Sequence, residues 1–125
     1  MRVLGLDHLV LRCADVEASL AWYTDVLGLA PERVGEWRAG TAPFPSVRVD
    51  ETTIIDLFGA EPTGANVDHL CFVVEPTDLD ALAGSGRLDV VGDGPIDGLF
   101  GAQGLATSLY VRDPDGNTVE LRCYR

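Results

Sequence analysis

Leu6-Asp7-His8-Leu9-Val10-Leu11 and Val67-Asp68-His69-Leu70-Cys71-Phe72 are two copies of one pattern, in which a histidine stands inside a hydrophobic run. Each copy is followed by a turn that contains an aspartate, Ala14-Asp15-Val16 in the first half and Thr77-Asp78-Leu79 in the second. Repetition at a long period indicates that the chain is built from two similar modules. We expect module one at 1–62 and module two at 63–125. Both would lie in a single domain, 1–125, because each half is small for a core of its own.

Hydrophobic spacing predicts an α+β fold with mostly antiparallel sheet and one helix per module on the outer face. The first helix is expected between Asp15, a good N-cap, and Gly28, which can end a helix in a left-handed conformation. A shorter second helix should start at Asp78. The expected strands are 3–12, about 30–36, 46–50, 53–58, 68–75, 87–91, 106–112 and 118–124. The loops 35–45 and 92–104 are expected to be either ligand-site walls or simple surface connections.

Composition narrows the classes of function. The chain has 125 residues and a net charge of -11 at pH 7, which disfavours nucleic acids and anionic membrane surfaces as partners. No hydrophobic run approaches the ~20 residues that cross a bilayer. The three cysteines, Cys13, Cys71 and Cys123, form no CxxC motif and lie in strand-like runs. They are expected to be buried free thiols of a cytoplasmic protein.

Four polar groups lie in the middle of hydrophobic strands: His8, Asp56, His69 and Glu120. Side chains alternate along a strand, so the residues opposite the histidines should pack on the helices, and the histidine faces should point to the other side of the sheet. Buried carboxylates need partners, and imidazoles with carboxylates suit a divalent metal. The alternative is that the histidines are satisfied core residues and that Glu120 pairs with an arginine such as Arg122 or Arg12.

The two histidine runs and the closing segment of the chain together resemble a known protein family. Together with the two histidine runs, the closing segment Asp113-Pro114-Asp115-Gly116-Asn117-Thr118-Val119-Glu120-Leu121 resembles the vicinal oxygen chelate superfamily. This superfamily includes glyoxalases, bleomycin-resistance proteins and extradiol dioxygenases. The resemblance spans essentially the whole chain and is greatest to small glyoxalase-like proteins.

The resemblance implies two tandem βαβββ modules that form a cupped sheet around a divalent metal ion: nickel, zinc, manganese, cobalt or iron. His8 and His69 match the first-strand ligands of the two modules, and Glu120 matches the last-strand carboxylate. Asp56 falls where glyoxalase I relatives carry glutamate, and its side chain is shorter by about 1.5 Å. Relatives are commonly homodimers.

The function expected from these residues is a metal-dependent lyase or isomerase of the glyoxalase type, acting on a small molecule chelated through vicinal oxygens. Glu120 or Asp56 would move a proton, and such a carboxylate needs a raised pKa. The candidates for the substrate-binding wall are Trp37, Phe44, Phe100 and Tyr110. One alternative is an extradiol-type dioxygenase. Enzymes of that type use a further histidine for proton transfer, whereas both histidines of this chain are already assigned as metal ligands. The other alternative is a metal-free protein that binds a drug-like molecule and confers resistance.

Overall fold

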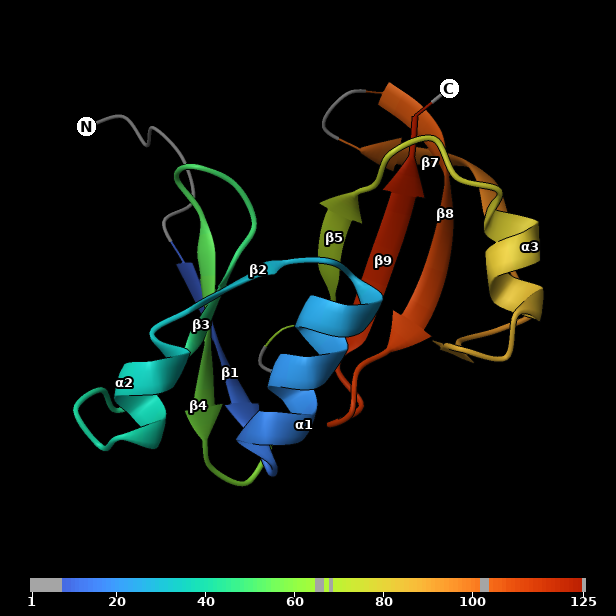
Figure 1. Ribbon diagram of the computed structural model, residues 1–125. Coiled ribbons are helices and arrows are strands. Elements are labelled where there is room, and N and C mark those ends of the chain that lie inside the picture. Colours follow the sequence, from blue (N-terminus) through green and yellow to red (C-terminus); the bar gives the residue numbers. More distant parts are fainter. Residues whose placement is uncertain (1–7, 65–66, 68, 102–103, 125) are drawn as a thin grey trace. The chain divides into compact units, whose positions relative to one another are not determined.

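The computed structural model describes residues 8–64, 67, 69–101 and 104–124, and its chain divides into two compact units, Met1–Gly64 and Ala65–Arg125. Each unit contains one mixed β-sheet and short helices (Figure 1). The α+β fold class predicted from the sequence is therefore confirmed. Within the described residues, no helix has the length and apolar character needed to span a membrane.

Unit 1 contains a four-stranded sheet in the order β1-β4-β3-β2. Strands β1 and β4 pair in parallel, whereas the other two pairings are antiparallel. The elements are β1 (His8–Cys13), α1 (Val16–Ala21), the π-helical turn η1 (Trp22–Val26), β2 (Ala30–Glu32), α2 (Val34–Arg38), β3 (Ser46–Arg48) and β4 (Ile54–Gly59).

Unit 2 repeats this topology with one strand more. Its sheet has the order β5-β9-β8-β6, with β7 also paired to β8, and only β5 and β9 are parallel. The elements are β5 (Leu70–Val73), α3 (Leu79–Gly84), β6 (Asp89–Val90), β7 (Ile96–Gly101), β8 (Gly104–Arg112) and β9 (Thr118–Cys123).

The first helix begins and ends where its sequence predicts. The Asp15 carboxylate accepts a hydrogen bond of 3.0 Å from the backbone N–H of Ala18, which satisfies one of the unpaired donors of the first turn. The helix continues from α1 into η1, and Gly28 then turns the chain with a φ of 71°. Thr24 donates from its hydroxyl to the Leu20 carbonyl at 2.8 Å, within the segment where the helix widens.

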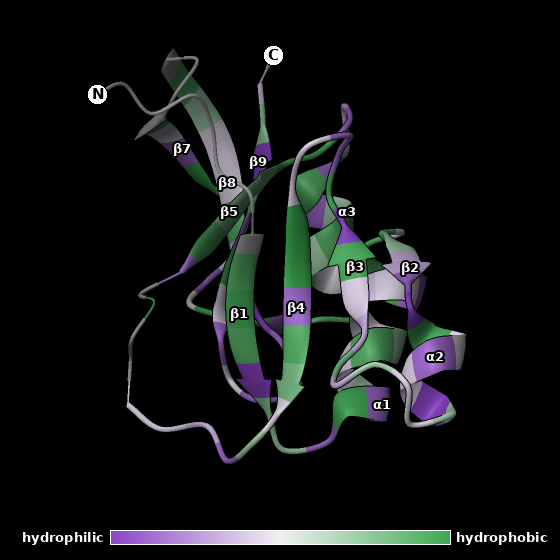
Figure 2. Ribbon diagram, turned by 90° about the vertical axis from the view of Figure 1, so that its left-hand side faces the viewer, coloured by the Kyte–Doolittle hydropathy of each residue, from purple (hydrophilic) through white to green (hydrophobic). Residues whose placement is uncertain are grey.

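One face of the unit 1 sheet forms the core. Strands β1 and β4 are mostly hydrophobic (Figure 2), and α1 packs against β4. Ile55 and Leu57 are buried on this face, whereas Val10 and Phe58 on the other face are 52% and 40% exposed. The alternation therefore places the helix on one side of the sheet and leaves hydrophobic side chains accessible on the side that carries Asp56.

Two segments differ from the sequence-based expectation. The strand expected at about 30–36 ends at Glu32, because Arg33 adopts a left-handed φ of 57° and helix α2 follows. The loop expected at 92–104 contains β7, whose alternation is interrupted by Gly98 at a φ of 73° and by a register shift between Ile96 and Leu99. In both places one left-handed residue changes the chain direction, and the hydrophobic period does not reveal it.

Candidate functional site

The strand registers give the two histidines equivalent positions in the two units. Val10 of β1 pairs with Asp56 of β4, and Cys71 of β5 pairs with Glu120 of β9. His8 and His69 each precede the paired residue, Val10 or Cys71, by two positions. Asp56 and Glu120 are therefore the corresponding carboxylates of the repeat.

Glu120 is the centre of a hydrogen-bonded cluster on one face of the unit 2 sheet. It is 4% exposed. Its Oε1 accepts from the Ser108 hydroxyl at 2.6 Å and from Arg122 Nη1 at 3.0 Å. Its Oε2 lies 3.3 Å from Nε2 of His69, whose side chain is 38% exposed. The two carboxylate oxygens thus have different neighbours, and Oε2 is the oxygen that faces His69, the histidine predicted to bind a metal ion.

Two further side chains surround this carboxylate. The Cys71 thiol hydrogen-bonds Glu120, and Tyr110, which is opposite Glu120 on β8, does so too. The Tyr110 ring also meets the His69 ring edge to face, with centroids 5.8 Å apart. Burial and the neighbouring Glu120 raise the pKa of Tyr110, and they raise the pKa of the Cys71 thiol to about 11. Both groups are consequently neutral hydrogen-bond donors at pH 7.

The pKa of Glu120 is shifted in the direction opposite to the one that the sequence analysis required of a proton-transferring carboxyl. Burial alone would raise this pKa, but hydrogen bonds from Ser108, Arg122 and Cys71 outweigh burial and lower it. The expectation of a raised pKa is wrong for Glu120. At neutral pH this carboxylate is ionised, as a metal ligand must be.

Asp56 is held in a simpler environment in unit 1. It is 6% exposed, and its Oδ1 accepts from the hydroxyl of Ser46 at 2.5 Å. Ser46 lies directly opposite on β3 and is fully buried. A serine on the neighbouring strand therefore supports the carboxylate in both units. Among the described residues an arginine does so only in unit 2, where Arg122 stands at the position of Phe58.

The His69 imidazole and the Glu120 carboxylate form a direct contact, and the same separation would also suit two ligands of one divalent ion. Two ligands that each bind an ion at about 2.1 Å lie about 3.0–3.4 Å apart when they occupy neighbouring coordination positions. The separation of 3.3 Å between Nε2 and Oε2 is within this range. Among the described side chains, no group of three or more histidine, cysteine, aspartate or glutamate residues gathers as a complete site. The side chain of His8 lies outside the described part of the chain.

The predicted wall residues have separate surroundings. Tyr110 lies beside His69, as stated above. Phe44 meets Phe58 edge to face at 6.2 Å and carries the guanidinium of Arg33 at 5.0 Å from its ring centre. Trp37 is half-buried on α2, and the side chain of Phe100 lies outside the described part.

Three residues of the cluster were not predicted as site residues: Ser108, Cys71 and Arg122. Cys71 was expected to be buried with the other cysteines, and this is wrong, because Cys71 is exposed while Cys13 and Cys123 are buried. The sequence indicates Arg122 only as an ion-pair partner of Glu120, in the alternative without a metal, and this ion pair is present at 3.0 Å. A comparison of the repeats would have found Ser108, since a serine precedes each carboxylate on the neighbouring strand.

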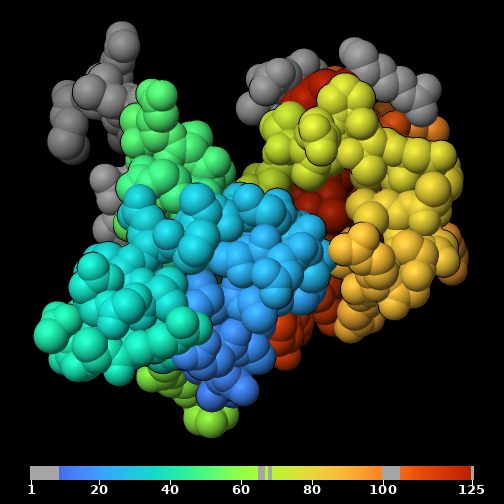
Figure 3. All heavy atoms as spheres, viewed as in Figure 1, coloured from blue at the N-terminus to red at the C-terminus, as the bar shows by residue number. Residues whose placement is uncertain are grey.

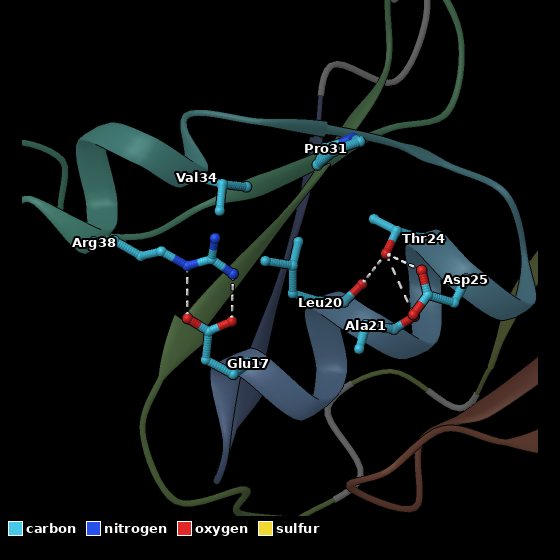
Figure 4. Close-up of a pocket in the computed structure, with 8 residues that line it drawn as sticks. All are labelled: Glu17, Leu20, Ala21, Thr24, Asp25, Pro31, Val34 and Arg38. Carbon is cyan, nitrogen blue, oxygen red and sulfur yellow. Dashed lines mark hydrogen bonds and ion pairs between the residues drawn. The ribbon is translucent and has the colours of Figure 1, made fainter.

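A pocket of about 310 Å³ lies elsewhere in unit 1, between α1, η1, β2 and α2 (Figure 4). At its edge the Arg38 guanidinium donates to both oxygens of Glu17, at 2.8 and 2.7 Å. The atoms of α1 and α2 lie side by side on this surface (Figure 3). None of the predicted site residues lines this pocket. The ion pair between Arg38 and Glu17 connects helix α2 to helix α1 at its edge.

Comparisons with known proteins match nearly the whole chain. The family model Glyoxalase/Bleomycin resistance protein/Dioxygenase superfamily matches residues 5–121. Glyoxalase domain-containing protein RDO1 of Mycosarcoma maydis is 32% identical over 129 residues, which cover 100% of this chain and 71% of that protein. Virulence protein STM3117 of Salmonella typhimurium is 28% identical over 123 residues, covering 95% of this chain and 83% of that protein.

Solved structures, of which we describe two, are similar to the whole chain. The crystal structure of STM3117 has a TM-score of 0.74 and covers 100% of both chains at 26% identity. Integron cassette protein VCH_CASS1, from the mobile metagenome of V. cholerae, has a TM-score of 0.76 at 32% identity and covers 100% of this chain and 98% of its own. The similarity therefore extends from the sequence to the fold.

Proposed function

Since the chain belongs to the glyoxalase/bleomycin resistance protein/dioxygenase superfamily, we propose that it is a metal-dependent lyase or isomerase of the glyoxalase type. Its substrate would be a small molecule that presents two adjacent oxygens to a divalent ion such as nickel, zinc, manganese, cobalt or iron. His8, His69 and Glu120 would hold this ion. The observation that supports the proposal most directly is the 3.3 Å separation between His69 Nε2 and Glu120 Oε2.

The ion would act as a Lewis acid that stabilises negative charge on the substrate oxygens. The protein's own residues would bind the substrate and move its proton. Asp56 is the stronger candidate for the proton acceptor, because among the described residues only its Oδ1 is held, by Ser46. Glu120, with its lowered pKa, is suited to remain ionised. The hydrophobic wall would be formed by Trp37, Phe44, Phe100 and Tyr110.

Metal analysis tests this proposal. Protein purified without added metal should contain a transition metal or should take up nickel, manganese or cobalt in titrations. His8→Ala should lose most of this binding while it keeps the circular dichroism of the native protein. A screen of hemithioacetals and catechols then distinguishes isomerase from dioxygenase activity. A protein that binds none of these metals would contradict the proposal.

A metal-free binding protein is the second candidate, and Arg122 favours it. The guanidinium is 3% exposed and its Nη1 lies 3.0 Å from Glu120 Oε1, so it already compensates this carboxylate's charge. The acidic net charge of -11 would suit a cationic drug-like ligand. Calorimetry with cationic glycopeptide drugs on metal-free protein would support this candidate if binding is unchanged in His8→Ala and His69→Ala.

The assembly and location of the protein are part of the same proposal. We expect a homodimer, since Val10, Phe58 and Val73 expose hydrophobic surface on the histidine faces of their sheets. Sedimentation velocity at micromolar concentration measures this, and a monomer would contradict it. Within the described part of the chain, Cys13, Cys71 and Cys123 form no disulfide, which supports a reducing compartment such as the cytoplasm.

A further inference from the structure

Arg122 is anchored in three directions within unit 2. Its Nη1 donates to Glu120 Oε1 at 3.0 Å, its Nη2 donates to the Leu99 carbonyl of β7, and its guanidinium carbon lies 5.0 Å from the ring centre of Tyr124. Only 3% of the residue is exposed. A planar guanidinium fixed at several points can hold a carboxylate in one orientation, which a lysine cannot reproduce.

The orientation matters because a glutamate carboxylate otherwise rotates broadly about its last torsion angle. Ser108 donates to the same oxygen, Oε1, that Arg122 holds. Both fixed donors therefore act on one side of the carboxylate. The plane of the group is set, and Oε2 is directed to the His69 Nε2 atom at 3.3 Å.

Within the described part of the two units, an arginine holds the carboxylate of Glu120 but not that of Asp56. Arg122 lies two residues after Glu120 on β9, and Phe58 lies two residues after Asp56 on β4. The Phe58 ring contacts Phe44 instead of a carboxylate. One carboxylate of the repeat is thus fixed by a cation and a serine, and the other by a serine.

We propose that Arg122 is a positioning residue that, with Ser108, fixes Glu120 Oε1 and thereby presents Oε2 to His69 and to a bound divalent metal. The part of this inference that concerns the metal rests on the proposed function. An alternative role for Arg122, simple charge compensation, predicts the opposite change in metal affinity. Removal of a positive charge beside a metal site strengthens cation binding by electrostatics, whereas loss of a positioned ligand weakens it.

Cobalt titration separates these roles. We expect Arg122→Met to weaken cobalt binding about 10- to 100-fold, the range for removal of a residue that orients a ligand, and to alter the visible absorption spectrum of the bound cobalt. Arg122→Lys keeps the charge and should still weaken binding. Ser108→Ala, a milder change, should weaken binding in the same direction if Arg122→Met does not fold. The matched control is Arg112→Met, which removes an exposed arginine of β8 and should leave the affinity unchanged.

Stronger or unchanged cobalt binding in Arg122→Met, or wild-type affinity in Arg122→Lys, would overturn the positioning role. A second measurement needs no metal. The chain has two histidines, so a His8→Ala sample assigns the imidazole ¹⁵N signals of His69. In metal-free protein, Arg122→Met should shift the Nε2 signal of His69, while Arg112→Met should not. An unshifted signal overturns the inference. If the wild-type protein binds no metal but this signal shifts, the proposed function fails and the positioning of Glu120 by Arg122 is upheld.

Discussion

The two serines that hold the repeat's carboxylates should contribute differently to stability. Ser46 and Ser108 are both fully buried, and they donate to Asp56 at 2.5 Å and to Glu120 at 2.6 Å. Replacement of either serine by alanine removes a hydrogen bond to a charged group, which is worth roughly 1.5–3 kcal/mol. In unit 2, Arg122 still donates to the same oxygen after Ser108→Ala. We therefore expect Ser46→Ala to cost about 2 kcal/mol and Ser108→Ala about 1 kcal/mol.

Urea denaturation at pH 7 measures both costs. The chain's two tryptophans, Trp22 and Trp37, belong to unit 1, so tryptophan fluorescence follows that unit while far-ultraviolet circular dichroism follows both. If both probes report the same unfolding transition, the midpoint of that transition gives the change in the free energy of unfolding for each variant. In an Asp56→Ala background, Ser46→Ala should cost almost nothing further, because its partner is gone. A Ser108→Ala cost equal to or above that of Ser46→Ala would refute the idea that Arg122 shares the support of its carboxylate.

Three further predictions test other contacts. Arg38→Met should lower the melting temperature at pH 7, and this effect should shrink as the pH is lowered below 4.5. The hydrogen bond from Arg38 lowers the pKa of Glu17 below its usual 4.5, so its stabilisation is fully present above that value and is lost as the pH falls through the lowered pKa. An effect that stays equal as the pH falls would contradict this. In metal-stripped protein, iodoacetamide should label Cys71 slowly at pH 8 and faster toward pH 11. Partial desolvation of the thiol and the neighbouring Glu120 carboxylate raise the pKa of Cys71 to about 11 although the residue is exposed. Mass spectrometry measures the rate, and rapid labelling at pH 7 would disprove this prediction. Leu121→Ala, in the core of unit 2, should cost about 3 kcal/mol in urea denaturation, whereas Leu105→Ala, at a site 68% exposed, should cost close to nothing; similar costs would show that the assigned core is incorrect.

Local sequence signals predicted those parts of the fold that depend on neighbouring residues. The helix after Asp15 and its end at Gly28 follow from capping and left-handed backbone preferences. The segment 113–117 is also held by a nearby residue, because the Asp113 carboxylate accepts from the backbone N–H of Asn117 at 2.8 Å. The sequence analysis does not predict helix α2 or strand β7. Arg33, before α2, and Gly98, within β7, change the chain direction through a left-handed backbone, and the spacing of hydrophobic residues does not indicate this.

The candidate site was predictable in its residue types but not in its contacts. The repeat indicated His69 and Glu120, and the structure brings them to 3.3 Å. The neighbours of Glu120 depend on the register of three strands, which places Ser108 and Cys71 around it. A single sequence does not determine that register, because a strand's alternation is compatible with several pairings. The lowered pKa of Glu120 has the same origin, since it results from those neighbours.

In each unit the first strand pairs with the last one, β1 with β4 and β5 with β9. During synthesis the first strand of each unit therefore cannot form this pairing until the last strand has been translated. Pairing between strands that are distant in the sequence also slows folding. The first half can close its sheet once Gly59, the end of β4, has left the ribosome, before any of the second half is needed. Synthesis thus offers this protein two successive opportunities to fold, each sealed by the final strand of its own half.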